Sequence, residues 1–256
     1  MAKKKYESSI NVEEIAKMTI GFSGAKLASL VNQAAIFSVL DGQKVISDKH
    51  LQDAFTEIIF GIKRPITLTE EDKRVTAIHE SGHALVTYFS SNSSPIFQAT
   101  ILPRGQALGS VFSFPGNEGS WTKAELLTRL DVAQAGKAAE ELIFGPEQVH
   151  TGCSGDYAMA QNLLDAYVIN LGLSSLGLVA SDKQQLSNEM KEIVELEMQN
   201  LVKESYQRVQ NVLASHKKEL LLLADTLMVH ETLSGEQITN LLNTGDINTS
   251  KDGADV

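Results

Sequence analysis

Residues 67–89 read TLTEEDKRVTAIHESGHALVTYF, and this stretch decides the fold expected for the chain. Thr67 or Thr69 can cap a helix whose first turn carries three acidic residues, a pattern typical of helix starts. Apolar residues flank the H-E-S-G-H run on both sides, so the helix is expected to be buried. Two histidines four positions apart would lie on one face of that helix. The stretch therefore predicts a buried helix that presents a pair of imidazoles.

The two histidines are His79 and His83, and their spacing predicts a zinc site. Two imidazole nitrogens on one helix face can reach the same ion at about 2.0–2.1 Å. Glu80 is rotated by about 100° from His79, so its carboxylate would lie beside the ion and could take a proton from a metal-bound water. Gly82 leaves space for backbone or substrate to approach closely. Without a metal, buried imidazoles need other polar partners, and the pair could then serve packing alone.

A catalytic zinc site needs a third protein ligand, and the sequence offers several. Metzincins would have a glycine at position 86 and a histidine at 89, but this chain has Val86 and Phe89, which excludes that class. The remaining candidates are downstream acids, which are Glu140, Glu141 and Asp156. The two glutamates could equally form a solvated helix face, and Asp156 could be a helix N-cap. Spacing alone does not choose among them.

The rest of the chain is predicted to be mostly helical. Helices are expected at residues 11–19, 23–42, 47–61, 122–144, 155–171 and roughly 187–215, followed by two shorter ones. The β-rich segments 96–103 and 108–114 are expected to form two strands. The expected fold is therefore mainly α with a small β-sheet, and Pro65 marks the boundary after a module of three helices.

Composition excludes several classes of protein. The 256 residues are 43% hydrophobic and 21% charged with a net charge of -10, which argues against a general nucleic-acid binder. No run approaches the roughly 18 apolar residues of a membrane helix. The single cysteine, Cys153, excludes an internal disulfide. Residues 1–9 are expected to be disordered or introduced by cloning, and residues 246–256 are expected to be a disordered tail.

Four motifs together resemble a known family. HESGHALV, TILPRGQALGSVFSFP, AGKAAEELIFG and TGCSGDYAMAQNL occur in the order, and at about the spacing, of the FtsH-type AAA+ zinc metalloproteases, peptidase family M41. The earlier stretch MTIGFSGAKLASLVNQAAIFSVLDGQKVISDKHLQDAF resembles the helical lid that ends their AAA+ ATPase module. The resemblance implies a small helical AAA+ lid at residues 10–64 and a helical zinc-metalloprotease domain at residues 65–245.

The resemblance also implies roles for the candidate site residues. His79, His83 and Asp156 would bind one zinc ion, and Glu80 would be the general base. Glu140 and Glu141 would then be supporting groups near the site.

Two positions depart from the family's pattern. His150 is an unusual neighbour of the motif and is expected at the surface or behind the ligands. Gly155 stands where family members often carry asparagine.

A substrate-binding strand is implied as well. The residues that resemble the family's edge strand are Leu108, Gly109, Ser110, Val111 and Phe112. An extended polypeptide can pair with such an edge through backbone hydrogen bonds, which tolerates many sequences.

The function implied is zinc-dependent endopeptidase activity on unfolded or extended polypeptides, as part of protein quality control. The family implies a homo- or hetero-hexameric ring with ATP-driven threading. No G-x-x-x-x-G-K-[ST] loop occurs, so ATP would act only in a longer parent of which this chain is a C-terminal part. The chain alone is expected to be soluble, without membrane contact, and its parent to be anchored in a bacterial, mitochondrial or chloroplast membrane. The alternative is a non-catalytic assembly or scaffold subunit of a protease ring.

Overall fold

The computed structural model describes residues 4–64, 66–105, 107–114, 120–179 and 186–248. The chain divides into two compact units, which are described separately below. Unit 1 comprises Met1–Thr67, Leu102–Ala107 and Phe114–Gly119, and unit 2 comprises Leu68–Ile101, Leu108–Ser113 and Ser120–Val256. The boundary expected at Pro65 lies outside the described residues.

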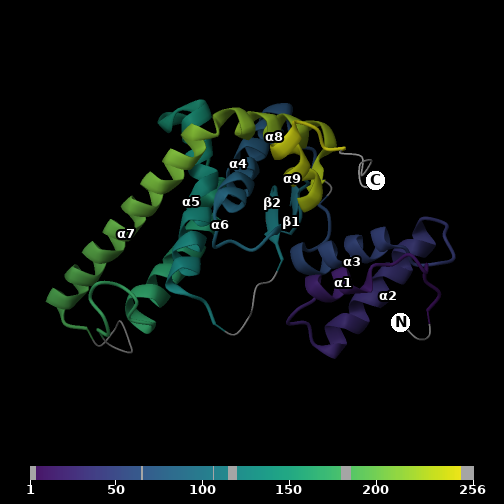
Figure 1. Cartoon of the computed structure of the whole chain (residues 1–256), viewed down its shortest axis with the longest axis horizontal. Helices are drawn as coiled ribbons and strands as arrows, with labels where there is room; N and C mark the ends of the chain where they lie inside the picture. Colours follow the sequence, from purple (N-terminus) through teal and green to yellow (C-terminus); the bar gives the residue numbers. More distant parts are fainter. Residues whose placement is uncertain (1–3, 65, 106, 115–119, 180–185, 249–256) are drawn as a thin grey trace, which may run out of the picture. The chain divides into compact units, whose positions relative to one another are not determined.

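Unit 1 is built on the predicted module of three helices (Figure 1). These are α1 (Val12–Met18), α2 (Gly24–Leu40) and α3 (Asp48–Phe60). The Asn11 side chain accepts a hydrogen bond from the Glu14 backbone N–H, which caps α1 as predicted. Leu30 of α2 and Leu51 and Phe55 of α3 are fully buried, so apolar contact between these two helices stabilises the unit.

Parts of the two ends that were expected to be disordered or, at the N-terminus, introduced by cloning contact the rest of their units. Ile46 donates its backbone N–H to the Lys5 carbonyl at 3.0 Å and accepts one from Glu7 at 2.9 Å, so these two residues of the N-terminal end are paired with the chain near Ile46. Backbone pairing and the fully buried Ile46 hold this segment in place. At the other end, Ile247 packs against the core of unit 2. The remaining parts of these two predictions, residues 1–3 and 249–256, lie outside the described residues.

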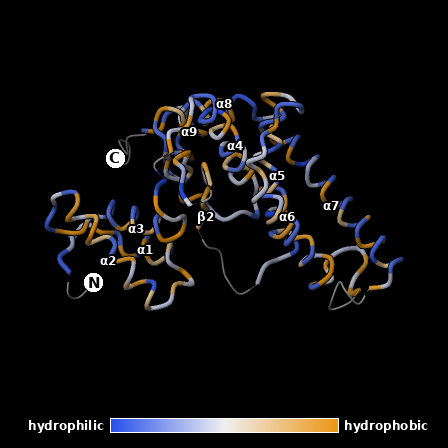
Figure 2. Tube along the Cα trace, turned by 180° about the vertical axis from the view of Figure 1, so that it is seen from behind, coloured by the Kyte–Doolittle hydropathy of each residue, from blue (hydrophilic) through white to orange (hydrophobic). Residues whose placement is uncertain are grey.

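Unit 2 contains the helices predicted after residue 67. They are α4 (Glu70–Phe89), α5 (Lys123–Phe144), α6 (Ser154–Asp165), α7 (Asn188–Ser215), α8 (Lys217–His230) and α9 (Gly235–Thr244). Thr69 is the cap of α4, because its Oγ1 accepts the Asp72 backbone N–H at 3.0 Å and Asp72 returns a hydrogen bond. A π-helical turn, Ala166–Asn170, continues α6. Hydrophobic and hydrophilic residues alternate along α7 (Figure 2), as expected for its amphipathic pattern.

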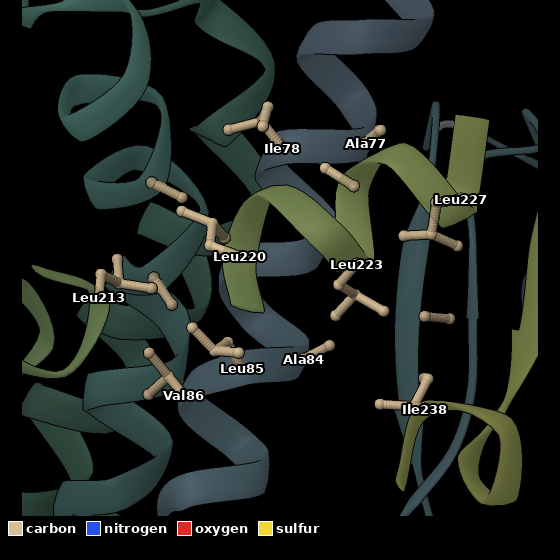
Figure 3. Packing of buried hydrophobic residues seen from close by; sticks show 14 of the residues in the cluster. Ala77, Ile78, Ala84, Leu85, Val86, Leu213, Leu220, Leu223, Leu227 and Ile238 are labelled. Carbon is tan, nitrogen blue, oxygen red and sulfur yellow. The ribbon is translucent and has the colours of Figure 1, made fainter. Parts of the chain in front are cut away.

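The core of unit 2 gathers around α4, which packs against both α5 and α8. Leu223 and Leu227 of α8 and Ala77 and Ala84 of α4 belong to one buried apolar cluster, and Figure 3 shows Leu223 near Ala84. All four side chains are fully buried. Small residues on α4 let the neighbouring helices approach closely, which holds the middle of α4 rigid.

The sheet of unit 2 has three antiparallel strands in the order β2-β1-β3. These are β1 (Ile96–Thr100), β2 (Ser110–Ser113) and β3 (Thr232–Ser234). The first two are shorter than predicted. Strand β3 was not predicted, since three residues between two helices give no alternating pattern.

The predicted fold class, mainly α with a small β-sheet, is confirmed for the described residues. None of the helices that the structure describes combines the length and the apolar character needed to cross a membrane.

Candidate metal centre

Two helices bring three possible metal ligands together. The middle of α4 carries His79 and His83, both buried, and the first turn of α6 carries Asp156. His79 Nε2 lies 3.1 Å from Asp156 Oδ2 and 3.1 Å from His83 Nε2. The His83 Nε2 atom lies 3.4 Å from the same carboxylate oxygen. In the part of the chain that the structure describes, these three side chains form a cluster that could hold a metal ion.

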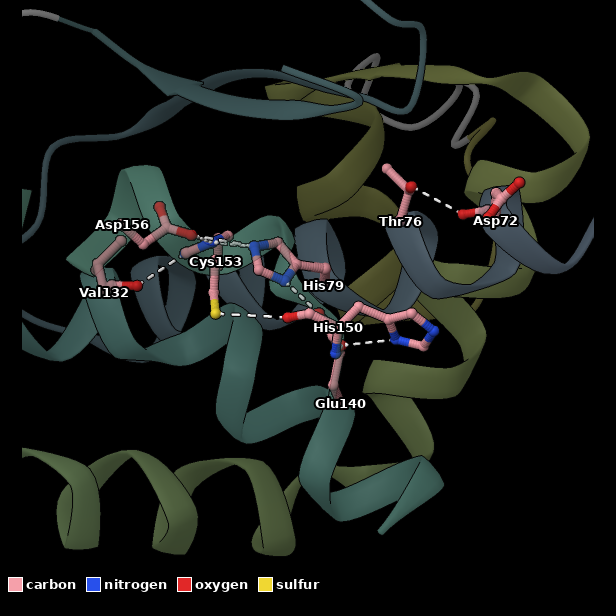
Figure 4. A network of polar contacts seen from close by, with 9 residues as sticks. Asp72, Thr76, His79, Val132, Glu140, His150, Cys153 and Asp156 are labelled. Carbon is pink, nitrogen blue, oxygen red and sulfur yellow. Dashed lines mark hydrogen bonds and ion pairs between the residues drawn. The ribbon is translucent and has the colours of Figure 1, made fainter. Parts of the chain in front are cut away.

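The other ring nitrogen of each histidine fixes its tautomer. His83 Nδ1 lies 2.8 Å from the Val132 carbonyl oxygen, which can only accept, so Nδ1 carries the proton. His79 Nδ1 lies 2.7 Å from Glu140 Oε1 and donates to that carboxylate. With Nδ1 as the donor, the neutral form of each ring would direct the lone pair of Nε2 into the cluster, where Asp156 adds a carboxylate oxygen (Figure 4). The carbonyl of Val132 could not be identified from the sequence.

These donors fit a zinc ion. Ligand atoms held tetrahedrally at about 2.0–2.1 Å from zinc lie roughly 3.3–3.4 Å from one another. The three observed separations, 3.1, 3.1 and 3.4 Å, are close to that value. Three protein ligands leave one of four positions open, which is the arrangement of catalytic rather than structural zinc sites. The α4 histidines and Asp156 could thus hold zinc with a position left for water.

The electrostatics of the cluster favour a bound cation. Burial opposes a charge on His79, but hydrogen bonds with Asp156 and Glu140 outweigh it and raise the pKa of His79 to about 10. Burial likewise opposes ionisation of Asp156, yet its hydrogen bonds with His79 and His83 lower its pKa. Without a metal, His79 therefore keeps a proton on each ring nitrogen, held between the carboxylates of Asp156 and Glu140, and a metal ion would replace the proton on Nε2.

Glu80 lies beside this cluster on α4. The residue is buried, and burial raises the pKa of its carboxyl, although the positive charges of His83 and His79 oppose the rise. A higher pKa brings a carboxylate closer to the range in which it can both take and return a proton. The role of Glu80 as a base stays a prediction, and a raised pKa is compatible with it.

Glycines permit the close approach of neighbouring elements. A Cβ atom at Gly82 would lie 2.6 Å from the Ala135 carbonyl oxygen, so this glycine lets the α5 backbone approach α4, as its position predicted. A Cβ atom at Gly136 would lie 2.4 Å from His79 Nε2. Gly136 thus leaves room for the imidazole, and the sequence carried no signal for this contact.

Of the two adjacent glutamates, only Glu140 reaches the cluster. Its neighbour Glu141 accepts a hydrogen bond from Tyr206 of α7, and it lies 3.3 Å from Lys137 Nζ. The supporting role near the metal predicted for Glu141 is therefore corrected to a link between α5 and α7. Adjacent helical residues point about 100° apart, which explains how the two carboxylates face different neighbours.

The remaining predicted positions are the substrate-binding segment, residues 108–112, and Gly155. Ser110, Val111 and Phe112 belong to β2, an edge strand among the three described, whereas Leu108 and Gly109 precede it. Gly155 has open space where a Cβ atom would be, so glycine is not required there by any close contact within 4 Å in the described structure.

Comparisons with known proteins agree on one family. The sequence profile of peptidase family M41 matches residues 66–241, and the profile of the AAA+ lid domain matches residues 9–53. The chain is 40% identical over 245 residues to the human ATP-dependent zinc metalloprotease YME1L1, covering 94% of this chain and 32% of that protein. It is 41% identical over 241 residues to the Arabidopsis thaliana ATP-dependent zinc metalloprotease FTSH 11, chloroplastic/mitochondrial, covering 93% of this chain and 30% of that protein.

A bacterial relative gives the same result. The chain is 38% identical over 257 residues to the ATP-dependent zinc metalloprotease FtsH of Rickettsia prowazekii, covering 95% of this chain and 40% of that protein. The chain thus spans about a third of the length of the curated relatives it matches.

Proposed function

The chain belongs to peptidase family M41, and we propose on this basis that it is the zinc-dependent endopeptidase part of a longer, FtsH-type ATP-dependent protease. Its substrates would be unfolded or extended polypeptides. The observation that carries the proposal is the convergence of His79 Nε2, His83 Nε2 and Asp156 Oδ2 within 3.4 Å of one another.

Each residue of the centre has a distinct task in this proposal. His79, His83 and Asp156 would hold zinc, which when bound lowers the pKa of a water from 15.7 to about 7 and polarises the scissile carbonyl. Glu80 would take a proton from a water beside it and return it to the leaving amine. The burial that raises the pKa of Glu80 helps the first of these transfers, because a more basic carboxylate takes up a proton more readily.

The substrate would be held by the segment from Leu108 to Phe112. Strand β2 pairs with β1 along one side, and in the described sheet its other side is an edge. An extended polypeptide could continue the sheet there through backbone hydrogen bonds. Gly109, at the start of this segment, contacts Glu80, so a chain bound along β2 would pass close to the base.

The wider context rests on the family. Residues 10–64 would form an AAA+ lid, and residues 65–245 the protease domain. The parent would be a homo- or hetero-hexamer that threads substrates with ATP and serves protein quality control. It would be anchored in a bacterial, mitochondrial or chloroplast membrane, in keeping with relatives such as FTSH 11, chloroplastic/mitochondrial.

A comparison of two substrates tests the proposal. The zinc-loaded chain should cleave casein, which is loosely folded, and should spare a stably folded protein such as a fluorescent β-barrel, because no ATPase motor unfolds it. A chelator should abolish cleavage, and zinc should restore it. Zinc binding without cleavage of casein would contradict the proposal and would favour the assembly or scaffold subunit.

A further inference from the structure

Glu140 is shared between a candidate metal ligand and a histidine at the surface. Its side chain is only 2% exposed. Oε1 accepts from His79 Nδ1 at 2.7 Å, while Oε2 accepts from the His150 backbone N–H at 2.8 Å and lies 3.1 Å from His150 Nδ1. Figure 4 shows the two imidazoles on either side of this carboxylate. A continuous chain of polar contacts therefore runs from His150 to the metal centre.

His150 is itself held from several directions. Its ring lies edge-on to Phe144, with the ring centroids 6.5 Å apart, and half of its side chain is exposed. Its carbonyl oxygen accepts a hydrogen bond from the thiol of Cys153 at 3.5 Å. His150 immediately precedes the 3-10 turn Thr151–Cys153, which leads directly into α6 and Asp156. The same residue thus contacts the partner of one candidate ligand and begins the loop that carries another.

We propose that His150 is a positioning residue for the metal centre, acting on His79 through Glu140 and on Asp156 through the loop that it anchors. This inference rests on the proposed function, since it assumes that the three ligands bind zinc. His150 does not touch the metal position itself in this proposal. It fixes the carboxylate that fixes the His79 ring.

The physical reason is the orientation of the Glu140 carboxylate. A buried carboxylate is held in place by the donors to its oxygens, and loss of the His150 imidazole would leave Oε2 with the backbone N–H as its one donor from residue 150, which favours rotation of the group. Rotation would lengthen the contact between Glu140 and His79 Nδ1 and would let the imidazole turn away from Asp156. Loss of a group that orients a metal ligand typically costs about 10–100-fold in metal affinity or activity. His150 acts one contact further out, so we expect a loss near the lower limit, about tenfold.

Three variants test the inference. His150→Ala removes the imidazole donor and keeps the backbone N–H. His150→Asn places a neutral N–H donor close to the position of Nδ1. His230→Ala is the matched control, because His230 is an exposed histidine at the end of α8, and it should leave both readouts below unchanged. Zinc affinity is measured by competition with a chelator, and ligand geometry by the visible absorption spectrum of the cobalt-substituted protein.

The expected result is a zinc Kd about tenfold higher for His150→Ala with a changed cobalt spectrum, and substantial recovery of both in His150→Asn. A zinc Kd and a cobalt spectrum identical to those of the native chain in His150→Ala would overturn the inference while leaving the proposed function intact. A loss that His150→Asn does not recover would also overturn it, because the imidazole would then matter for packing rather than for its donor. Failure of the native chain to bind zinc would instead overturn the proposed function together with this inference.

Discussion

Gly109 lies directly against Glu80: a Cβ atom at position 109 would be 2.7 Å from Glu80 Cγ and 2.8 Å from Oε1. The same atom would be 2.8 Å from the Thr100 carbonyl oxygen at the end of β1. The segment proposed to bind substrate and the proposed base are therefore packed together. Only a residue without a side chain allows this contact.

Gly109→Ala should consequently impair catalysis more than metal binding. The added methyl group must displace either the Glu80 carboxylate or the start of β2, and a small displacement of a proton-transfer group can cost about 100-fold in rate. We expect a comparable drop in kcat for a peptide substrate, with zinc affinity within a few-fold of the native value. Gly152→Ala is the control, because a Cβ atom there meets nothing within 4 Å. Equal kcat values for Gly109→Ala and the native chain would contradict the claim that packing of Gly109 against Glu80 matters for catalysis.

Substitutions of Asp156 and Glu141 should change different properties, zinc affinity for Asp156 and stability for Glu141. Asp156→Ala removes a proposed ligand and should weaken zinc binding by more than about 100-fold, beyond the loss typical of outer groups. Glu141→Ala should leave zinc affinity nearly unchanged but lower the free energy of unfolding by about 1–3 kcal/mol, because the Tyr206 hydroxyl loses its acceptor. Chelator competition and urea unfolding measure the two effects. The reverse pattern would assign the third ligand to α5.

Removal of the Ser81 hydroxyl is expected to stabilise the folded protein. The residue is fully buried beside Glu80, and among the described residues its Oγ has no hydrogen-bond partner. Ser81→Ala should raise the free energy of unfolding by about 1 kcal/mol, since a buried hydroxyl without a partner is costly.

Ser205 is the matched control for that prediction, because it is equally buried but accepts a hydrogen bond from Gln134 Nε2. Ser205→Ala should lower the free energy of unfolding by about 1–3 kcal/mol, since the amide loses its partner. Urea unfolding of both variants decides the matter. Similar losses for the two serines would mean that Ser81 has a partner in solution.

The raised pKa of Glu80 predicts a pH-dependent stability in the metal-free protein. Burial disfavours the ionised carboxylate in the native state, whereas in the unfolded chain the group titrates near its ordinary value of 4.5. Ionisation therefore destabilises the native state as the pH rises above that value. Glu80→Gln, which cannot ionise, should be more stable than the native chain at pH 8, and the difference should shrink as the pH falls toward 4.5. A difference that stays constant with pH would contradict this assignment.

The parts of the fold that could be predicted depend on local signals. The caps Asn11 and Thr69 and the 3.6-residue periodicity report contacts within a few residues, so the helices lie close to their predicted ranges. Strand β3 depends on pairing with β1, more than 130 residues away, because Thr100 lies opposite Thr232. Three residues are too short a segment for the sequence pattern to predict such a pairing.

The candidate site likewise contains residues that local sequence signals predict and residues that they do not. His79 and His83 are visible because a helix sets their relation, whereas the choice of Asp156 depended on a resemblance to the family. The roles of the Val132 carbonyl, Gly136 and His150 arise from the packing of α5 and the following loop against α4. No spacing in the sequence encodes those distances.

The most direct test of the central claim measures zinc content and casein cleavage together, for the native chain and for Glu80→Gln. We predict about one zinc ion per chain in both proteins, because Glu80 is beside the ligands rather than among them, with cleavage by the native chain alone. Zinc in neither protein, with no cleavage by the native chain even after zinc is added, would contradict the account. Undiminished cleavage by Glu80→Gln would equally contradict it, because the base would then lie elsewhere.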